Sequence, residues 1–145
     1  MKNMYVMNAT DVRKEWSTVT ESVVRERPQF IKRTRDKVIL ASLPLFENVL
    51  EAYKLTADKM VEDDGSITLS LHEIDLIENA DNEEAAVLAL GKSILEYAQD
   101  FYNEFSLWSA APNRKGHIPY VLKALIIDDP KKIGDLITVC QTGKN

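Results

Sequence analysis

The chain has 145 residues, a hydrophobic content of 45% and a net charge of −5, which suits one ordinary domain or two small ones and excludes wholesale disorder. No apolar run reaches the ~18 residues of a membrane span, and the N-terminal residues lack the apolar core of a signal peptide. A single cysteine, Cys140, excludes an internal disulfide and suits a reducing compartment, so we expect a cytoplasmic protein.

The charge is divided unevenly along the chain. Residues 1–55 carry ten Lys/Arg against seven Asp/Glu, a net charge of +3, whereas residues 56–145 carry eight against sixteen, a net charge of −8. A mildly basic front and an acidic back indicate two functions in one chain.

The front of the chain begins with a predicted strand over residues 3–7 and a helix that Asn8 caps and Pro28 ends. Four apolar residues fall on one face of this helix and predict its buried stripe: Val12, Trp16, Val19 and Val23. Residues 29–33 and 37–41 then predict a hairpin around a basic turn.

A second helix is predicted over residues 43–60, where apolar residues recur at helical spacing. The acidic stretch 62–66 contains a glycine and no apolar residue, which is typical of a linker. We therefore predict a first domain over residues 1–61 and a second over residues 62–145.

The back domain starts with an alternating strand at residues 67–71, and a second short strand is expected at 74–77. Asp81 or Asn82 caps a long helix, whose apolar stripe runs to Trp108. Two shorter helices follow, one over residues 120–127 and one that starts at Pro130 and continues to about residue 139.

With these elements placed, residues 3–60 resemble the N-terminal domain of the Phd/YefM family of antitoxins. The resemblance rests on the order strand, helix, hairpin, helix, and on the sequence Asn8-Ala-Thr-Asp-Val-Arg13, where the family often has Ser-x-x-Glu-Ala-Arg. It also rests on Pro28 after the helix, on a strand that ends in Lys32-Arg33, and on Ser42 after the second strand. Residues 67–97 resemble, more faintly, the HicB antitoxin domain.

The resemblance implies a small β-α-β-β-α domain, followed here by a mostly helical domain with one or two short strands, an α+β fold. Phd/YefM antitoxins form homodimers that bind operator DNA and repress their own transcription, and a segment beyond this domain neutralises a toxin. Two features differ from the family pattern: the hairpin turn reads Arg35-Asp-Lys37 where glycine is common, and the back domain is longer and more apolar than the usual tail.

The resemblance and the chemistry of the side chains together give two sets of candidate residues. A helix N-terminus and exposed guanidinium groups can both bind phosphate, and the expected DNA contacts are Thr10, Arg13, Lys14, Lys32, Arg33 and Arg35. The acidic back domain suits a basic toxin, and the expected partner contacts lie on the long helix and are Glu96, Tyr97, Asp100, Tyr102 and Glu104.

Catalytic and metal-binding patterns are weak in this sequence. Gly91-Lys92-Ser93 copies the end of a phosphate-binding loop, but the earlier glycine is missing and the segment falls within a helix. His72 and His117 lack a second ligand at helical spacing, so we expect no metal, no cofactor and no enzymatic activity.

The sequence thus predicts a cytoplasmic, homodimeric antitoxin of a type II toxin–antitoxin system that represses its own promoter and neutralises a toxin. Two alternatives stay open: a dimeric protein-interaction adaptor that does not bind DNA, and a solitary transcriptional regulator without a toxin. The charges on the front domain fit an ordinary solvated surface as well as a DNA-binding one.

Overall fold

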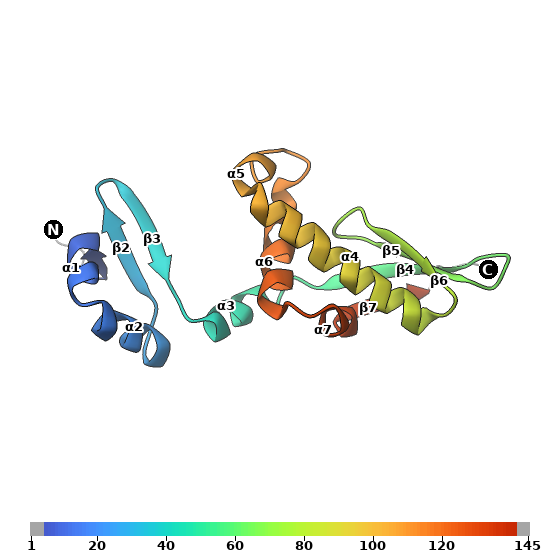
Figure 1. Cartoon of the computed structure of the whole chain (residues 1–145), viewed down its shortest axis with the longest axis horizontal. Coiled ribbons are helices and arrows are strands. Elements are labelled where there is room, and N and C mark those ends of the chain that lie inside the picture. The colour runs from blue at the N-terminus through green and yellow to red at the C-terminus, as the bar shows by residue number, and fades with distance from the viewer. Residues whose placement is uncertain (1–4, 142–145) are drawn as a thin grey trace. The chain divides into compact units, whose positions relative to one another are not determined.

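The protein is described by a computed structural model over residues 5–141. The chain divides into two compact units, residues 1–49 and residues 50–145, and each contains a β-sheet with helices (Figure 1). The predicted α+β class is confirmed. The division falls earlier than the predicted boundary after residue 61, because residues 55–61 form a strand of the second unit instead of the end of a helix.

The first unit contains a three-stranded sheet with two helices packed on one face. The sheet has the order β1-β2-β3, with β1 parallel and β3 antiparallel to β2. Its elements are β1 (Val6–Asn8), α1 (Ala9–Lys14), α2 (Trp16–Arg25), β2 (Gln29–Arg33) and β3 (Asp36–Leu40). The predicted strand over residues 3–7 falls partly outside the described residues, and its described part begins at Val6.

The core of the first unit is small. Val12, Val19 and Val23 are buried, as predicted, against strand residues that include Ile31. Trp16 was predicted to join them, and this prediction is wrong: 54% of its surface is exposed. The helix is interrupted at Glu15, with φ −115° and ψ 36°, so Trp16 starts a new helix instead of continuing the buried stripe.

The hairpin forms as predicted, with its second strand one residue earlier. Thr34 has a φ of 57°, in the left-handed region that tight two-residue turns require. Phe30 and Ile39 are directly opposite each other in the β2–β3 pair. Because Ile31 faces the helices and side chains alternate along a strand, Phe30 and Ile39 lie on the other face, where they are 45% and 56% exposed.

The second unit contains a four-stranded sheet of order β6-β5-β4-β7, in which β4 and β7 are parallel and the other pairs are antiparallel. Helix α3 (Leu43–Leu50) ends where this unit begins. The strands are β4 (Leu55–Val61), β5 (Ile67–Leu71), β6 (Ile77–Ala80) and β7 (Ile137–Gln141). Of these strands only β5 has its predicted bounds, and the sheet contains more strands than the one or two predicted for the back domain.

Two segments predicted as helix are strands because they pair with each other. Residues 55–61 and 137–141 form the parallel β4–β7 ladder, which joins Leu55 to Ile137 and Lys59 to Gln141. The expected linker at residues 62–66 is instead the turn between β4 and β5. Gly65 adopts a φ of 87° there, and the amide of Glu62 donates to the carbonyl of Ser66 at 2.8 Å.

The helices of the second unit pack around the longest of them, α4 (Figure 1). They are α4 (Glu83–Asn103), α5 (Phe105–Trp108), the 3-10 turn η1 (Lys115–His117), α6 (Ile118–Ile127) and α7 (Pro130–Asp135). The two caps predicted in this unit are present, since the side chain of Asn82 accepts from the amide of Ala85 and Asp129 accepts from the amide of Lys131. The cap predicted for the first helix is not formed, because the side chain of Asn8 makes no capping hydrogen bond. The predicted stripe of the long helix is interrupted at Glu104, where α5 begins.

Helices α4 and α7 approach each other closely at two glycines. A Cβ atom on Gly91 would lie 2.2 Å from the carbonyl oxygen of Pro130, and one on Gly134 would lie 3.0 Å from a methyl group of Val87. The close packing of α4 on α7 therefore accounts for the glycine at position 91, and the resemblance of this segment to part of a phosphate-binding loop needs no functional explanation. Within residues 5–141, no helix is long and apolar enough to cross a membrane.

Candidate functional site

A shallow groove of about 570 Å³ lies on the first unit, where α1 and the start of α2 meet β2. Its lining residues come from three elements and are Ala9, Val12, Arg13, Trp16, Ile31 and Arg33. Packing of Val12 against Ile31 joins the helix to the strand. This contact brings Arg13 and Arg33, twenty residues apart in sequence, to one groove.

The guanidinium groups of Arg13 and Arg33 are exposed. Within residues 5–141, neither takes part in a hydrogen bond or an ion pair. Asp36 lies opposite Arg33 in the strand register without forming an ion pair with it. Two unpaired guanidinium groups at one groove can bind phosphate oxygens, because each offers several N–H donors in a planar fork.

The other four predicted DNA contacts are exposed but do not line the groove. Thr10 and Lys14 lie on α1, and Arg35 lies in the hairpin turn. Lys32 pairs across the hairpin with Lys37 and lies on the face of the sheet away from the helices, because it alternates with Ile31 and Arg33. The structure therefore groups Arg13 with Arg33 and leaves Lys32 on the opposite face.

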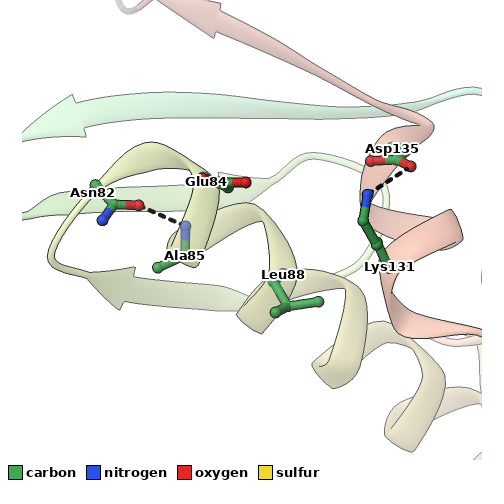
Figure 2. Close-up of a pocket in the computed structure, with 6 residues that line it drawn as sticks. All are labelled: Asn82, Glu84, Ala85, Leu88, Lys131 and Asp135. Atoms are coloured by element: carbon green, nitrogen blue, oxygen red, sulfur yellow. Dashed lines mark hydrogen bonds and ion pairs between the residues drawn. The ribbon is translucent and has the colours of Figure 1, made fainter.

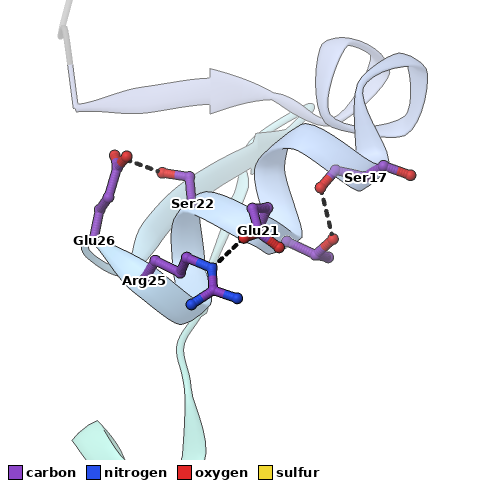
Figure 3. A network of polar contacts seen from close by, with 6 residues as sticks. Ser17, Glu21, Ser22, Arg25 and Glu26 are labelled. Carbon is purple, nitrogen blue, oxygen red and sulfur yellow. Dashed lines mark hydrogen bonds and ion pairs between the residues drawn. The ribbon is translucent and has the colours of Figure 1, made fainter.

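The outer surface of α2 has a different electrostatic character (Figure 3). Arg25 forms an ion pair with Glu21 one turn earlier, and the hydroxyl of Ser22 donates to Glu26 at 3.2 Å. Acidic and basic groups there satisfy each other, so this surface offers no unpaired positive charge to an anion. Arg25 is thus a useful reference for the unpaired arginines of the groove.

The predicted partner contacts on the second unit separate into two groups. Glu96, Asp100, Tyr102 and Glu104 are exposed, and Tyr102 exposes 62% of its surface. Tyr97 is instead half-buried, and its hydroxyl lies 2.6 Å from Nδ1 of His117.

Tyr97 belongs to a cluster of rings that closes the end of the second unit. Its ring lies against Phe101 and Trp108, and the guanidinium of Arg114 lies 4.1 Å from the centroid of the Trp108 ring. Burial raises the pKa of Tyr97 and lowers the pKa of His117. The sequence contained no local signal for this cluster, because Arg114 and His117 come from the loop after α5.

A second depression, of about 340 Å³, lies beside the start of α4 and α7 (Figure 2). It is lined by Asn82, Glu84, Ala85, Leu88, Lys131 and Asp135. The side chain of Asn82 is used in capping α4, and Lys131 pairs with Asp135 at 3.4 Å. Among the residues that the structure describes, no group of three or more His, Cys, Asp or Glu side chains could hold a metal ion.

Comparison with known protein families gives a match over nearly the whole chain. A PHD-like family model, described as the antitoxin of a toxin–antitoxin RelE/RelB system, matches residues 1–139. The match therefore includes the second unit, and the HicB resemblance of residues 67–97 stays a prediction. No curated protein gives a significant match.

A similar solved structure gives the same assignment. The crystal structure of the antitoxin part of a candidate toxin/antitoxin system from Syntrophomonas wolfei subsp. wolfei has 33% sequence identity and a TM-score of 0.89. The alignment covers 98% of this chain and 100% of that one. Antitoxins are regulatory proteins, which confirms the expectation of a non-enzymatic function, and the chain belongs to the PHD-like family of antitoxins of toxin–antitoxin systems.

Proposed function

We propose that this antitoxin is a homodimeric, type II repressor that binds operator DNA upstream of its own gene through the groove of the first unit. The observation that carries the proposal is the pair of exposed arginines, Arg13 and Arg33, which lie at one groove without internal partners. Arginine can bind phosphate oxygens and can also pair with a guanine edge in the major groove.

The charge of the first unit supports this assignment. Residues 1–49 carry nine Lys/Arg against six Asp/Glu, a net charge of +3, and a dimer doubles this value. Helix α1 has only six residues, so its dipole contributes little to anion binding. We therefore assign the main contacts to Arg13 and Arg33, with Thr10, Lys14 and Arg35 as neighbouring contacts on the same unit.

The open face of the first sheet is the proposed dimer surface. Phe30 and Ile39 lie opposite each other on this face, and neither belongs to the buried core of the unit. Among the described residues of this unit three are buried in its core, so it has little internal apolar contact. A second copy covering Phe30 and Ile39 would remove more apolar surface from water. Lys32 and Lys37 lie on the same face of the sheet, nearer the hairpin turn than Ile39.

The second unit is the proposed toxin-binding part. Residues 50–145 carry nine Lys/Arg against seventeen Asp/Glu, a net charge of −8, which suits a basic toxin. Tyr102 and Leu107 are 62% and 64% exposed and can serve as apolar anchors beside Asp100 and Glu104. Glu96 extends the acidic surface, and we assign Tyr97 a supporting role because its hydroxyl contacts His117.

The DNA-binding proposal is tested by fluorescence anisotropy with the full-length protein and a labelled duplex from upstream of its own gene. A scrambled duplex of equal length serves as the reference. We expect tighter binding to the upstream duplex, and weaker binding to both duplexes as salt rises, because bound phosphates release counterions. Equal absence of binding to both duplexes at low salt would contradict the proposal and favour the adaptor alternative.

The toxin-binding proposal is tested by co-expression of the full-length protein with the product of the neighbouring gene. We expect the two to co-purify, and we expect the complex to weaken when Tyr102 and Leu107 are both changed to Ser. Unchanged affinity in this double variant would place the toxin contact elsewhere. The matched control changes Val61 and Ile77 to Ser, since both are similarly exposed but lie on the sheet.

A further inference from the structure

Trp16 is a largely exposed tryptophan in the first unit. Over half of its surface is exposed, although tryptophan is a large apolar residue that usually packs against its neighbours. Within residues 5–141, its indole N–H has no hydrogen-bond acceptor and its ring has no aromatic partner. The interruption of the helix at Glu15 places this residue at the start of α2.

The groove that contains Trp16 indicates which class of molecule could bind over it. It lines the same groove as Arg13 and Arg33, and the other lining residues are Ala9, Val12 and Ile31. The groove therefore combines two unpaired positive charges with an apolar surface and has no acidic side chain in its lining. A nucleic acid has this same combination, because charged phosphates alternate with the apolar faces of sugars and with base edges.

A second copy of the chain is a weaker match for this surface. The proposed dimer face carries Phe30 and Ile39, which point away from the helices, whereas Ile31 and Arg33 alternate with them and lie on the helix side of the sheet. Trp16 thus lies on the other side of the sheet from the dimer face. A second copy docked groove to groove would also bring its own Arg13 and Arg33 against these two unpaired arginines, which is unfavourable.

We infer that Trp16 is a third nucleic-acid contact of the groove, in which the indole packs against a sugar or a base edge between phosphates held by Arg13 and Arg33. This inference rests on the proposed DNA-binding function and adds an apolar contact to it. An apolar contact and a phosphate contact differ in one measurable respect. Loss of a phosphate contact reduces the dependence of affinity on salt, whereas loss of an apolar contact does not.

The first test compares the salt dependence of DNA affinity in full-length variants. Trp16→Ala should weaken binding to the upstream duplex by about tenfold, the size of one aromatic contact with a base, and should leave the slope of log affinity against log salt unchanged. Arg13→Ala should reduce that slope by about one. The matched control, Val24→Ala, removes an apolar side chain that is 67% exposed on α2 outside the groove, and it should change neither quantity.

The second test keeps Trp16 in place, so its result does not depend on whether Trp16→Ala folds correctly. Trp16 and Trp108 are the only two tryptophans, and Trp108→Phe leaves Trp16 as the single indole fluorophore. We expect the emission of this variant to shift or quench on titration with the upstream duplex, and to remain constant on dilution through the dimer–monomer transition.

Three results would overturn the inference, and they are distinguishable. Unchanged DNA affinity in Trp16→Ala, with weakened affinity in Arg13→Ala, would reject Trp16 alone and retain the proposed function. A Trp16 signal that follows protein dilution instead of DNA would show that a second copy covers the indole. Absence of DNA binding by the wild-type protein would contradict the proposed function and this inference together.

Discussion

The two units differ in how completely each buries its own apolar surface. In the first, the buried core consists of Val12, Val19 and Val23, and large apolar side chains such as Trp16 and Ile39 remain more than half exposed. In the second, sixteen residues of the described chain form one buried cluster that connects the sheet to α4, α6 and α7. The second unit therefore buries far more of its apolar surface within itself than the first does.

The two units also differ in net charge. The first unit carries +3 from nine bases and six acids, and the second carries −8 from nine bases and seventeen acids. The unit with the smaller buried core is thus also the one with a net positive charge, which favours an anionic partner. The proposed function assigns a partner to each exposed surface of the first unit, a second copy to the open face of the sheet and DNA to the groove. It predicts different consequences for substitutions in the two units.

The largest effect on stability is expected for Gly91→Ala. The added Cβ would lie 2.2 Å from the carbonyl oxygen of Pro130, so the backbone of α4 or α7 must move, at a cost of about 1–3 kcal/mol. Gly116→Ala is the matched control, since nothing lies within 4 Å of its Cβ position. Urea denaturation followed by circular dichroism measures both. An equal free energy of unfolding in the two variants would contradict the close packing of α4 on α7.

A charged substitution at the proposed dimer face should weaken self-association. Ile39→Asp places a carboxylate where a second copy should cover the sheet, and we expect dimerisation to weaken about a hundredfold, ~3 kcal/mol. Val24→Asp is the control, because Val24 is exposed on α2. Sedimentation equilibrium of the full-length variants measures the association. A dimer that persists in Ile39→Asp would exclude this face as the interface.

The same comparison shows which features the sequence could predict. Residues 29–33 and 67–71 are strands with the predicted bounds, and the caps at Asn82 and Asp129 were also correct, because alternation and capping are local signals. The strands at 55–61 and 137–141 were missed because they pair with each other across most of the second unit. Ala57 and Met60 are three residues apart, which continues a helical spacing, whereas Leu55 and Ala57 are two residues apart, which fits a strand. Only the pairing with the distant strand decides between the two patterns.

The candidate site was predictable to a similar degree. All six predicted DNA contacts are exposed, as basic residues and threonine on a small unit usually are. That Arg13 and Arg33 share a groove depends on the packing of Val12 on Ile31, which no local pattern contains. Trp16 was assigned to the core because helical periodicity assumes an uninterrupted helix, and the interruption at Glu15 has no proline or glycine to reveal it.

A modest effect on toxin binding is expected when two exposed acids of the second unit are neutralised. Asp100→Asn with Glu104→Gln should weaken the complex by about 0.2–1 kcal/mol for each charge, mainly through a slower association rate. The difference from wild type should vanish at high salt, because exposed charges are screened. Asp63→Asn, in the β4–β5 turn, is the control. Surface plasmon resonance that shows a salt-independent loss would contradict an electrostatic role.

The smallest effect concerns His117 and pH. Burial lowers the pKa of His117, Asp75 opposes this shift and Arg114 adds to it, so the folded state disfavours the protonated ring. The contribution to stability is therefore complete above the unfolded-state value of 6.5 and declines as pH falls from there toward the lowered pKa of the folded state. In the protonated ring both nitrogens are donors, so Nδ1, which lies 2.6 Å from the hydroxyl of Tyr97, can then only donate to it.

His117→Gln should remove part of this pH dependence, because the glutamine amide can donate to or accept from the hydroxyl of Tyr97 but does not titrate. Melting temperatures of the wild type and the variant, measured between pH 8 and pH 5, compare the two slopes. We expect the wild type to lose slightly more stability on acidification. Parallel curves over this range would show that His117 does not couple the ring cluster to pH.

The central claim is that the groove of the first unit binds DNA through Arg13 and Arg33, and one measurement tests it most directly. Anisotropy titrations of the upstream duplex compare the full-length double variant Arg13→Ala/Arg33→Ala with Arg25→Ala, whose arginine is already paired with Glu21. We predict that the double variant loses about 1–3 kcal/mol of binding free energy for each arginine that pairs with a base, and that Arg25→Ala stays close to wild type. Unchanged DNA affinity in a folded double variant would contradict the account.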